Sequence, residues 1–270
     1  MKNKIKDNRQ GTRQFKLFKN IKHQTRNKKM SSKRLFIKET NSTNSLLKQL
    51  LNEGAYEDKF LLYTDFQTNG VGQVGNSWES ERGKNLLFSI LLYPQQITIN
   101  NQFIISQIIS LAIVKTLERY DAGFSIKWPN DIYWNDKKMG GTLIENSIQG
   151  KKIKTSIIGI GLNINQKVFL SKVPNTISLV HILGKSMNRK NILNEIFSNF
   201  EILYNKFDEK SIRKSYFEFL YRNVGFHSYK ENGVVFKARI ANVFGDGKLE
   251  LETNTGEKKA YYFKEVEFVV

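Results

Sequence analysis

The chain has 270 residues and a mass of 31.4 kDa, and 40% of its residues are hydrophobic. A chain of this size can bury the core of one substantial domain and a small second one. It contains no cysteine, which excludes disulfide bonds, thiolate metal sites and a catalytic thiol. The most apolar segment, residues 103–117, is interrupted by polar residues and is shorter than the ~18 apolar residues of a membrane span. We therefore expect a soluble, cytoplasmic protein with no membrane partner.

The positive charge is concentrated at the start of the chain. Residues 1–34 hold thirteen Lys or Arg and one acidic residue, a net charge of +12 out of +18 for the whole chain. This head has few apolar residues and no sustained periodicity, so residues 1–33 are expected to be disordered or weakly helical. A solvated tail is the favoured interpretation. Nonspecific attraction to nucleic acid is the alternative.

The remaining pattern predicts two folded parts, residues 34–223 and 224–270. In the first part, strands are expected at residues 35–39, 59–67, 85–94, 124–128, 130–134, 140–146 and 154–164, and helices at 41–54, 103–120, 188–207 and 211–223. The helix at 41–54 has Ser42 or Thr43 as its N-cap and Gly54 as its stop. Strands in a mixed or antiparallel sheet with segregated helices indicate an α+β fold.

The second part, residues 224–270, has short strands separated by turn residues. Asn232-Gly233, residues 245–247 and residues 254–256 are typical hairpin turns. Their spacing predicts a small β-barrel.

The most informative stretch runs from Lys127 to Asn165. Pro129 has a restricted φ and pushes the preceding residue toward extended geometry, so Lys127 is expected at a stiff strand end. A pre-positioned cation suits an anionic reaction centre. Gly140 and Gly141 allow close approach of the backbone to a ligand. Taken singly, Lys127 or the glycines favour a purely structural interpretation, a pair of antiparallel strands with a bulge at the glycines.

Four motifs in order, KWPND (127–131), KMGG (138–141), EN (145–146) and GIGLNIN (159–165), resemble the catalytic core of biotin protein ligases. That family activates biotin with ATP and attaches it to a carboxylase carrier domain. The resemblance implies a class II synthetase-like biotin/lipoate ligase catalytic domain followed by an SH3-like C-terminal domain. Some members carry an N-terminal DNA-binding domain, but the head is too short and too irregular to build one, so the resemblance is to the monofunctional type.

The resemblance also implies roles for residues. Lys127 would be the catalytic residue that bridges the biotin carboxylate and the α-phosphate of ATP. The implied biotin-binding residues are Ser42, Thr43, Asn44, Gln67, Gly70, Val71, Gly72, Gln73, Lys127, Gly140 and Gly141. The implied ATP-binding residues are Gly72, Gln73, Trp78, Lys127, Asn130, Asn163 and Asn165. Ordinary helix capping is the alternative role for Ser42, Thr43 and Asn44.

Asp131 and Asn163 are candidates to hold Mg²⁺ through the nucleotide, because a hard cation prefers oxygen ligands. The expected partner is the biotin carboxyl carrier domain of a biotin-dependent carboxylase. A homodimer is compatible with the resemblance, whereas nucleic acid is not a favoured partner.

The loop after the second strand departs from the family pattern. Gly70, Gly72 and Gly75 spell GxGxxG, but a strand follows where a dinucleotide-binding fold needs a helix. The loop instead resembles the biotin-binding loop of the ligases, in which basic residues are usual where Val71 stands and frequent where Gln73 stands. We therefore predict weaker retention of the activated intermediate, unless Arg82 or Lys84 compensates.

Two other functions fit parts of the sequence. Lipoate or octanoate ligases and transferases share a related scaffold and a similar lysine. A nucleic-acid binder would use the basic head instead. His23, His181 and His227 lie in unrelated segments and predict no metallohydrolase site.

Overall fold

The structure is a computed structural model that describes residues 33–73, 76–170 and 175–269. The predictions for residues 1–32 and for Gly75 lie outside the described residues. The chain divides into two compact units, residues 1–35 and residues 36–270. Of the first unit, only residues 33–35 are described, so the site below and all of the fold except residues 34–35 belong to the second unit.

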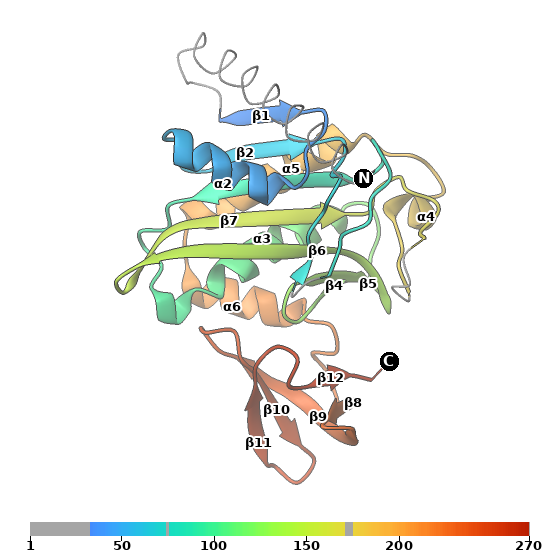
Figure 1. Cartoon of the computed structure of the whole chain (residues 1–270). Coiled ribbons are helices and arrows are strands. Elements are labelled where there is room, and N and C mark those ends of the chain that lie inside the picture. The colour runs from blue at the N-terminus through green and yellow to red at the C-terminus, as the bar shows by residue number, and fades with distance from the viewer. Residues whose placement is uncertain (1–32, 74–75, 171–174, 270) are drawn as a thin grey trace, which may run out of the picture. The chain divides into compact units, whose positions relative to one another are not determined.

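A seven-stranded sheet forms the centre of the fold (Figure 1). Its strands are β1 (Arg34–Ile37), β2 (Phe60–Thr64), β3 (Leu86–Leu92), β4 (Phe124–Lys127), β5 (Asp131–Trp134), β6 (Lys137–Gln149) and β7 (Lys152–Leu162), in the order β1-β2-β3-β7-β6-β5-β4. From β2 to β4, every neighbouring pair is antiparallel. The predicted α+β class is confirmed.

Strand β2 ends earlier than the sequence predicts. The strand was expected to reach Gln67 but ends at Thr64, whose hydroxyl lies 3.3 Å from the amide of Phe66 and 3.1 Å from its carbonyl oxygen. Such a local side-chain bond turns the backbone out of the ladder. Gln67 instead forms an isolated parallel bridge with Thr40, which brings it to the start of the preceding helix, α2 (Thr43–Glu53).

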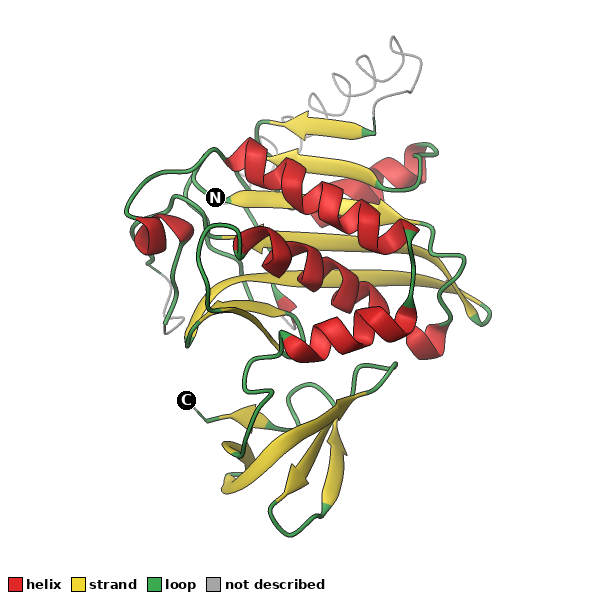
Figure 2. Ribbon diagram, turned by 180° about the vertical axis from the view of Figure 1, so that it is seen from behind, coloured by secondary structure: helices red, strands yellow, loops and turns green. Residues whose placement is uncertain are grey.

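Helices cover both faces of this sheet. Figure 2 shows three of them on one face, namely α3 (Ile104–Leu117), α5 (Arg189–Asn205) and α6 (Glu209–Glu218). Helix α2 (Thr43–Glu53) packs on the other face, against β2, β3 and β7. Every residue of α3 except Lys115 is buried, as expected for a helix that is apolar on all sides.

Two short helical segments were not predicted, the 3₁₀ turn η2 (Ile99–Asn101) and α4 (Leu179–Leu183). Both are too short for a helical period to be read from the sequence. Within the described part of the chain, no helix is long and apolar enough to cross a membrane.

The C-terminal segment forms a separate five-stranded sheet. Its strands are β8 (His227–Glu231), β9 (Val234–Val243), β10 (Leu249–Thr253), β11 (Lys258–Tyr261) and β12 (Glu267–Phe268), in the order β11-β10-β9-β8-β12. All neighbouring pairs are antiparallel. Asn232 and Gly233 have φ values of 49° and 86°, the left-handed geometry that an Asn-Gly hairpin requires. The antiparallel sheet agrees with the predicted SH3-like fold.

The C-terminal sheet also contacts the part of the same compact unit that contains the seven-stranded sheet. The indole Nε1 of Trp128 donates a hydrogen bond of 2.8 Å to the carbonyl oxygen of Gly247. The amide of Phe103 donates one of 3.0 Å to the carbonyl oxygen of Gly245. These bonds join the turn between β9 and β10 to the end of β4 and the start of α3.

Candidate active site

A cavity of about 870 Å³ opens where several elements end. Its lining comes from the N-terminus of α2, the loop between β2 and β3, and the turn between β4 and β5. The first half of β6, the end of β7 and residues 263–268 complete it. This volume lies within the range of small-molecule sites and is large enough for more than one small ligand.

The structure brings most of the predicted site residues together in this cavity. Its lining includes Ser42, Thr43, Asn44, Gln67, Val71, Gly72, Gln73, Trp78, Lys127, Asn130, Asp131, Gly141 and Asn163. Three predicted residues, Gly70, Gly140 and Asn165, are not among the lining residues. The lining also contains Lys138, Thr142, Gly159, Phe263, Lys264 and Phe268, for which the sequence predicted no ligand contact.

One end of the cavity is a wall of short polar side chains. The Oε1 atom of Gln67 accepts hydrogen bonds from the backbone amide of Thr43 at 2.7 Å and from its hydroxyl at 3.1 Å. The buried hydroxyl of Ser89 lies 2.7 Å from Thr43 Oγ1 and 2.6 Å from Asn44 Oδ1. Asn44 Nδ2 donates to Glu145 Oε2 at 2.8 Å. These hydrogen bonds fix the orientation of the Thr43, Asn44 and Gln67 side chains in this wall.

Ser42 occupies the N-cap position of α2, as predicted, but its side chain makes no capping hydrogen bond. The side chain is buried and borders the cavity. Its hydroxyl group is therefore available for a ligand rather than being used by the helix.

Two glycines of β7 form a flat floor. A Cβ atom on Gly159 would lie 2.5 Å from Asn44 Oδ1, and one on Gly161 would lie 2.5 Å from Cε2 of the Trp78 indole. Both distances are shorter than real contacts, so these positions must be glycine for Asn44 and Trp78 to lie where they do. The GIG sequence thus places an amide and an indole against the sheet.

Several residues that line the cavity carry a buried polar atom that has no partner. Among the described residues, these atoms include Trp78 Nε1, Thr142 Oγ1, Asn163 Oδ1 and Gln73 Oε1. Buried polar groups are hydrogen-bonded in most folded proteins. A ligand could satisfy these atoms only if their side chains turned to face the cavity.

Lys127, at the end of β4, supplies a half-buried cation. Its Nζ donates a hydrogen bond of 3.1 Å to the hydroxyl of Tyr133 and lies over the rings of Tyr133, Tyr221 and Phe268. Burial lowers the pKa of the Lys127 ammonium, and the nearby Asp131 carboxylate opposes that lowering. A partly desolvated cation attracts anions more strongly than one in water.

Asp131 is engaged in an ion pair. Its Oδ1 lies 2.7 Å from the Nζ of Lys138. Within the described ranges, no three His, Cys, Asp or Glu residues are grouped so as to hold a metal ion. The contact of Asp131 and Asn163 with Mg²⁺ through the nucleotide stays a prediction.

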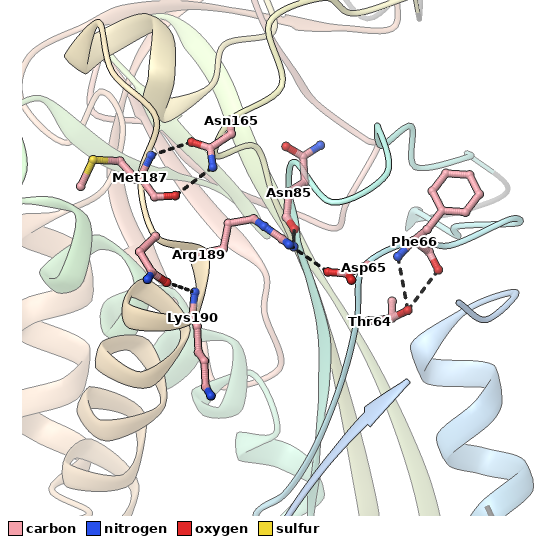
Figure 3. A network of polar contacts seen from close by, with 9 residues as sticks. Thr64, Asp65, Phe66, Asn85, Asn165, Met187, Arg189 and Lys190 are labelled. Atoms are coloured by element: carbon pink, nitrogen blue, oxygen red, sulfur yellow. Dashed lines mark hydrogen bonds and ion pairs between the residues drawn. The ribbon is translucent and has the colours of Figure 1, made fainter. Parts of the chain in front are cut away.

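Gly140 and Asn165 have structural roles. A Cβ atom on Gly140 would clash with the side chain of Leu162 and lie 2.7 Å from the carbonyl oxygen of Gly161. Asn165 forms two hydrogen bonds with the backbone of Met187, of 2.9 and 2.8 Å (Figure 3). Gly70 is also packed closely, since its Cβ would lie 2.7 Å from the carbonyl oxygen of Trp78.

Figure 3 also shows a clamp at the base of the loop that leads from β2 to β3. Arg189, the first residue of α5, lies 2.8 Å from Asp65 Oδ1 and donates a bond of 2.9 Å to the carbonyl oxygen of Asn85. Asp65 directly follows β2 and Asn85 directly precedes β3. One guanidinium therefore ties together both ends of the segment that carries Val71, Gly72 and Gln73.

We expect Arg189 and Asp65 to show an interaction free energy of about 0.5 to 1 kcal/mol in a double-mutant cycle with Arg189→Met and Asp65→Asn. The two side chains are 24% and 32% exposed, so solvent screens the pair only in part. Urea unfolding of the four proteins measures the coupling. The exposed pair Lys214 and Glu218, at 4.0 Å, is the control and should couple less. Equal coupling in both cycles would contradict the clamp.

The two described histidines make local contacts away from the cavity. His181 Nδ1 lies 2.9 Å from Ser178 Oγ, and His227 Nε2 lies 2.7 Å from the carbonyl oxygen of Val224. His23 lies outside the described residues.

Comparison with known proteins links this geometry to one family. The profile of the biotin/lipoate A/B protein ligase family matches residues 36–163. The bifunctional ligase/repressor BirA of Bacillus subtilis is 30% identical over 233 residues, which are 82% of this chain and 69% of that protein. Biotin–protein ligase 2 of Arabidopsis thaliana is 28% identical over 170 residues, 61% of this chain and 50% of that protein.

A solved structure agrees with the sequence matches. The biotin protein ligase from Aquifex aeolicus in complex with biotin and ATP superimposes with a TM-score of 0.71 at 26% identity. The match covers 87% of this chain and 99% of that chain. It therefore extends through the C-terminal sheet as well as the larger one.

Proposed function

Because the chain belongs to the biotin/lipoate A/B protein ligase family, we propose that it activates biotin with ATP and transfers it to a carrier protein. The reaction forms biotinoyl-5′-AMP and pyrophosphate, and a carrier lysine then displaces AMP. One observation carries the proposal: a single cavity joins the polar wall around Thr43 and Gln67 to the half-buried cation of Lys127. Such a cavity suits a ligand with a neutral polar ring at one end and a carboxylate at the other.

The polar wall is the proposed site of the ureido ring. A ureido group presents N–H donors and a carbonyl acceptor, and it needs short hydroxyl and amide partners. Ser42, Thr43, Asn44 and Gln67 supply these groups within the cavity lining. Because Gly159 adds no side chain, the ring can lie against the sheet beside Asn44.

Lys127 is the proposed catalytic residue. In the first step, a carboxylate oxygen of biotin attacks the α-phosphorus and the bond to pyrophosphate breaks, which brings an anion toward a polyanion. A positioned ammonium lowers this repulsion and can contact both partners. In the second step, the carrier amine attacks the acyl carbon, loses a proton and releases AMP.

The nucleotide is proposed to lie toward Trp78, Gly72, Gln73, Asn130 and Asn163, which line the same cavity. Trp78 and Asn163 also each carry an unpaired buried polar atom, Nε1 and Oδ1 respectively. Mg²⁺ would arrive with the phosphates of ATP. Asp131, which is paired with Lys138, and Asn163 are the residues proposed to contact it through the nucleotide.

We propose a catalytic domain at residues 34–223, an SH3-like domain at residues 224–270 and a basic head at residues 1–33. The proposed acceptor is the carrier domain of a biotin-dependent carboxylase, in the cytoplasm, where ATP is supplied. Gel filtration with and without biotin and ATP would distinguish a monomer from a homodimer.

Incubating the full chain with labelled biotin, ATP and a carrier domain tests the function. The label is expected on the acceptor lysine of the carrier, and replacing that lysine with arginine should prevent it. Parallel reactions with lipoate and octanoate test the alternative substrates, and transfer of either in place of biotin would refute the proposal. Deleting residues 1–30 tests the nucleic-acid alternative, since a ligase keeps its activity without the head.

The loop that borders the nucleotide end is expected to retain the adenylate weakly. Val71 is 45% exposed and Gln73 is uncharged, and a missing charged hydrogen bond costs about 1.5 to 3 kcal/mol. Arg82 pairs with Glu39 and stacks on Phe66, and neither Arg82 nor Lys84 lines the cavity. These two residues are therefore not placed to compensate.

With biotin, ATP and bystander protein, we expect wild-type protein to label bystander lysines, and Val71→Arg to reduce that labelling by slowing release of the adenylate. Mass spectrometry of the bystander measures the label. Val224→Arg, which adds the same charge at an exposed position outside the cavity lining, is the control and should not change it. Labelling confined to the carrier with wild-type protein would refute the prediction.

A further inference from the structure

The Lys127 ammonium is surrounded by aromatic side chains from three separate elements. Its Nζ lies 4.8 Å from the ring centroid of Tyr133 in β5, 6.0 Å from that of Tyr221 after α6, and 5.3 Å from that of Phe268 in β12. The hydroxyl of Tyr133 also accepts its hydrogen bond. We infer that Tyr133, Tyr221 and Phe268 form an aromatic cage that positions Lys127 for the proposed adenylation. The inference rests on the proposed function and adds three positioning residues to it.

An aromatic cage holds a cation without neutralising it. A ring attracts an ammonium through its quadrupole and carries no net charge. A carboxylate partner would instead cancel the charge that biotin and ATP need. The nearest acid in sequence, Asp131, is paired with Lys138 at 2.7 Å. The positive charge of Lys127 is thus held in place and is still available to an anionic substrate.

The cage walls are themselves fixed in position. Tyr133 and Tyr221 are 9% and 8% exposed, and their ring centroids are 5.4 Å apart. The Tyr221 hydroxyl donates to Asp136 Oδ1 at 2.5 Å, and its backbone amide donates to the carbonyl oxygen of Ile126 at 2.9 Å. Tyr221 is therefore tied to the strand that carries Lys127.

The third wall comes from the C-terminal sheet. The ring of Phe268 packs on Tyr229, with centroids 5.0 Å apart and planes at 64°. It also packs on Tyr221, at 6.3 Å. Phe268 lines the cavity, as does Lys127. Strand β12 has only two residues, and its pairing with β8 places Phe268 opposite Tyr229. The C-terminal sheet thus contributes a side chain that touches the proposed catalytic lysine.

The charged and titratable groups around Lys127 determine the sign of the pH effect. Asp131 favours the ammonium, whereas burial, Arg222 and Lys138 favour the neutral amine. Burial also raises the pKa of both Tyr133 and Tyr221, so the phenols remain neutral. Adenylation needs the ammonium, so activity is present below the pKa of Lys127 and is lost as pH rises through it. Removing a ring lowers this pKa further and moves the alkaline limb to lower pH.

The test replaces Phe268 with leucine, which keeps the site apolar but removes the ring. Biotin-dependent pyrophosphate exchange is measured across pH. We expect Phe268→Leu to lower kcat about fivefold with little change in KM for biotin, and to shift the alkaline limb to lower pH. Phe268→Tyr and Phe268→Trp keep a ring and should restore both values. A leucine variant with wild-type kcat and pH profile would overturn the inference.

Phe236→Leu is the matched control. Phe236 packs on Tyr229 and Tyr261 in the same sheet but makes no contact with Lys127 among the ring contacts of the described residues. It should lower thermal stability while leaving the kcat and pH profile unchanged. If Phe236→Leu and Phe268→Leu had the same kinetic effect, the cage would be only a packing feature.

A second readout separates the cage from the proposed function. The Lys127 side chain is followed by nitrogen NMR of ¹⁵N-lysine-labelled full chain, and its signal is assigned by its loss in Lys127→Arg. Phe268→Leu should lower the pKa of Lys127 whether or not the protein turns over biotin. Normal biotinylation with an unchanged pKa in the variant would refute the cage alone. A lowered pKa in a protein that never uses biotin would refute the proposed function alone.

Discussion

Replacing Lys127 with alanine is expected to lower the kcat of adenylate formation at least about 10²- to 10³-fold. This is the loss seen when one preorganised charge-stabilising group is removed. The ammonium is the cation that the cavity presents beside Tyr133 and Phe268. Without it, the biotin carboxylate must approach the phosphates of ATP against unscreened repulsion. Biotin-dependent pyrophosphate release measures the effect directly.

The stability of the variant must be measured in parallel. Lys127→Met, which keeps the aliphatic stem against the aromatic rings, should be as inactive as Lys127→Ala and should melt near the wild-type temperature. Lys115→Met removes a charge from an exposed position of α3 and should leave pyrophosphate release unchanged. Near-normal release from a folded Lys127→Met protein would exclude the assigned role.

Local patterns in the sequence predicted most of the elements. The apolar spacing of α2, with Ser42 at its start and Gly54 at its end, predicts the observed helix within two residues. The α5 helix and the strands β3, β4, β5 and β7 lie within two residues of their expected bounds. Strand β6 is three residues longer at each end than predicted, and α6 ends at Glu218 rather than at Asn223. Elements too short to show a hydrophobic period in the sequence were missed, such as the five residues of α4 and the two residues of β12. A strand of two residues exists only because β8 supplies its partner.

The sequence did not predict which distant segments contact one another in the candidate site. Lys127 was identified from its motif, but Phe268 lies in another sheet and no local signal connects the two. Asn165 and Gly140 belong to the same motifs as true lining residues, yet one bonds to Met187 and the other packs on Leu162. A motif identifies a strand and its turns. Which of its side chains face the cavity depends on register and on the neighbouring strands.

The GIG sequence in β7 predicts one feature of the site but not the residues that contact it. Glycines two residues apart in a strand lie on one face of the sheet, so the pattern at 159 and 161 predicts a face without side chains. It does not predict what covers that face. The structure shows that Asn44 from α2 lies over Gly159 and that Trp78 from the loop lies over Gly161. The two glycines thus bring a predicted biotin contact and a predicted nucleotide contact onto neighbouring parts of one surface.

Gly159→Ala should raise KM for biotin at least about tenfold, equivalent to about 1.4 kcal/mol of binding. The new Cβ would lie 2.5 Å from Asn44 Oδ1 and 2.9 Å from its Cγ. Asn44 has little room to move away, because Ser89 and Glu145 both hold its amide group. The methyl group must therefore displace Asn44 from the polar wall, or push biotin off the floor of the cavity. Titration calorimetry with biotin in the absence of ATP measures the binding loss without the chemical step.

Gly54→Ala provides the matched control. Gly54 has an extended backbone, with φ of −176°, and a Cβ there would meet nothing within 4 Å. The same methyl group should therefore leave biotin affinity unchanged. A second variant, Ser89→Ala, removes one bond to Asn44 without adding bulk and should weaken binding less than Gly159→Ala. If Gly159→Ala bound biotin as tightly as the control while remaining folded, the biotin ring would have to lie elsewhere in the cavity, away from Asn44.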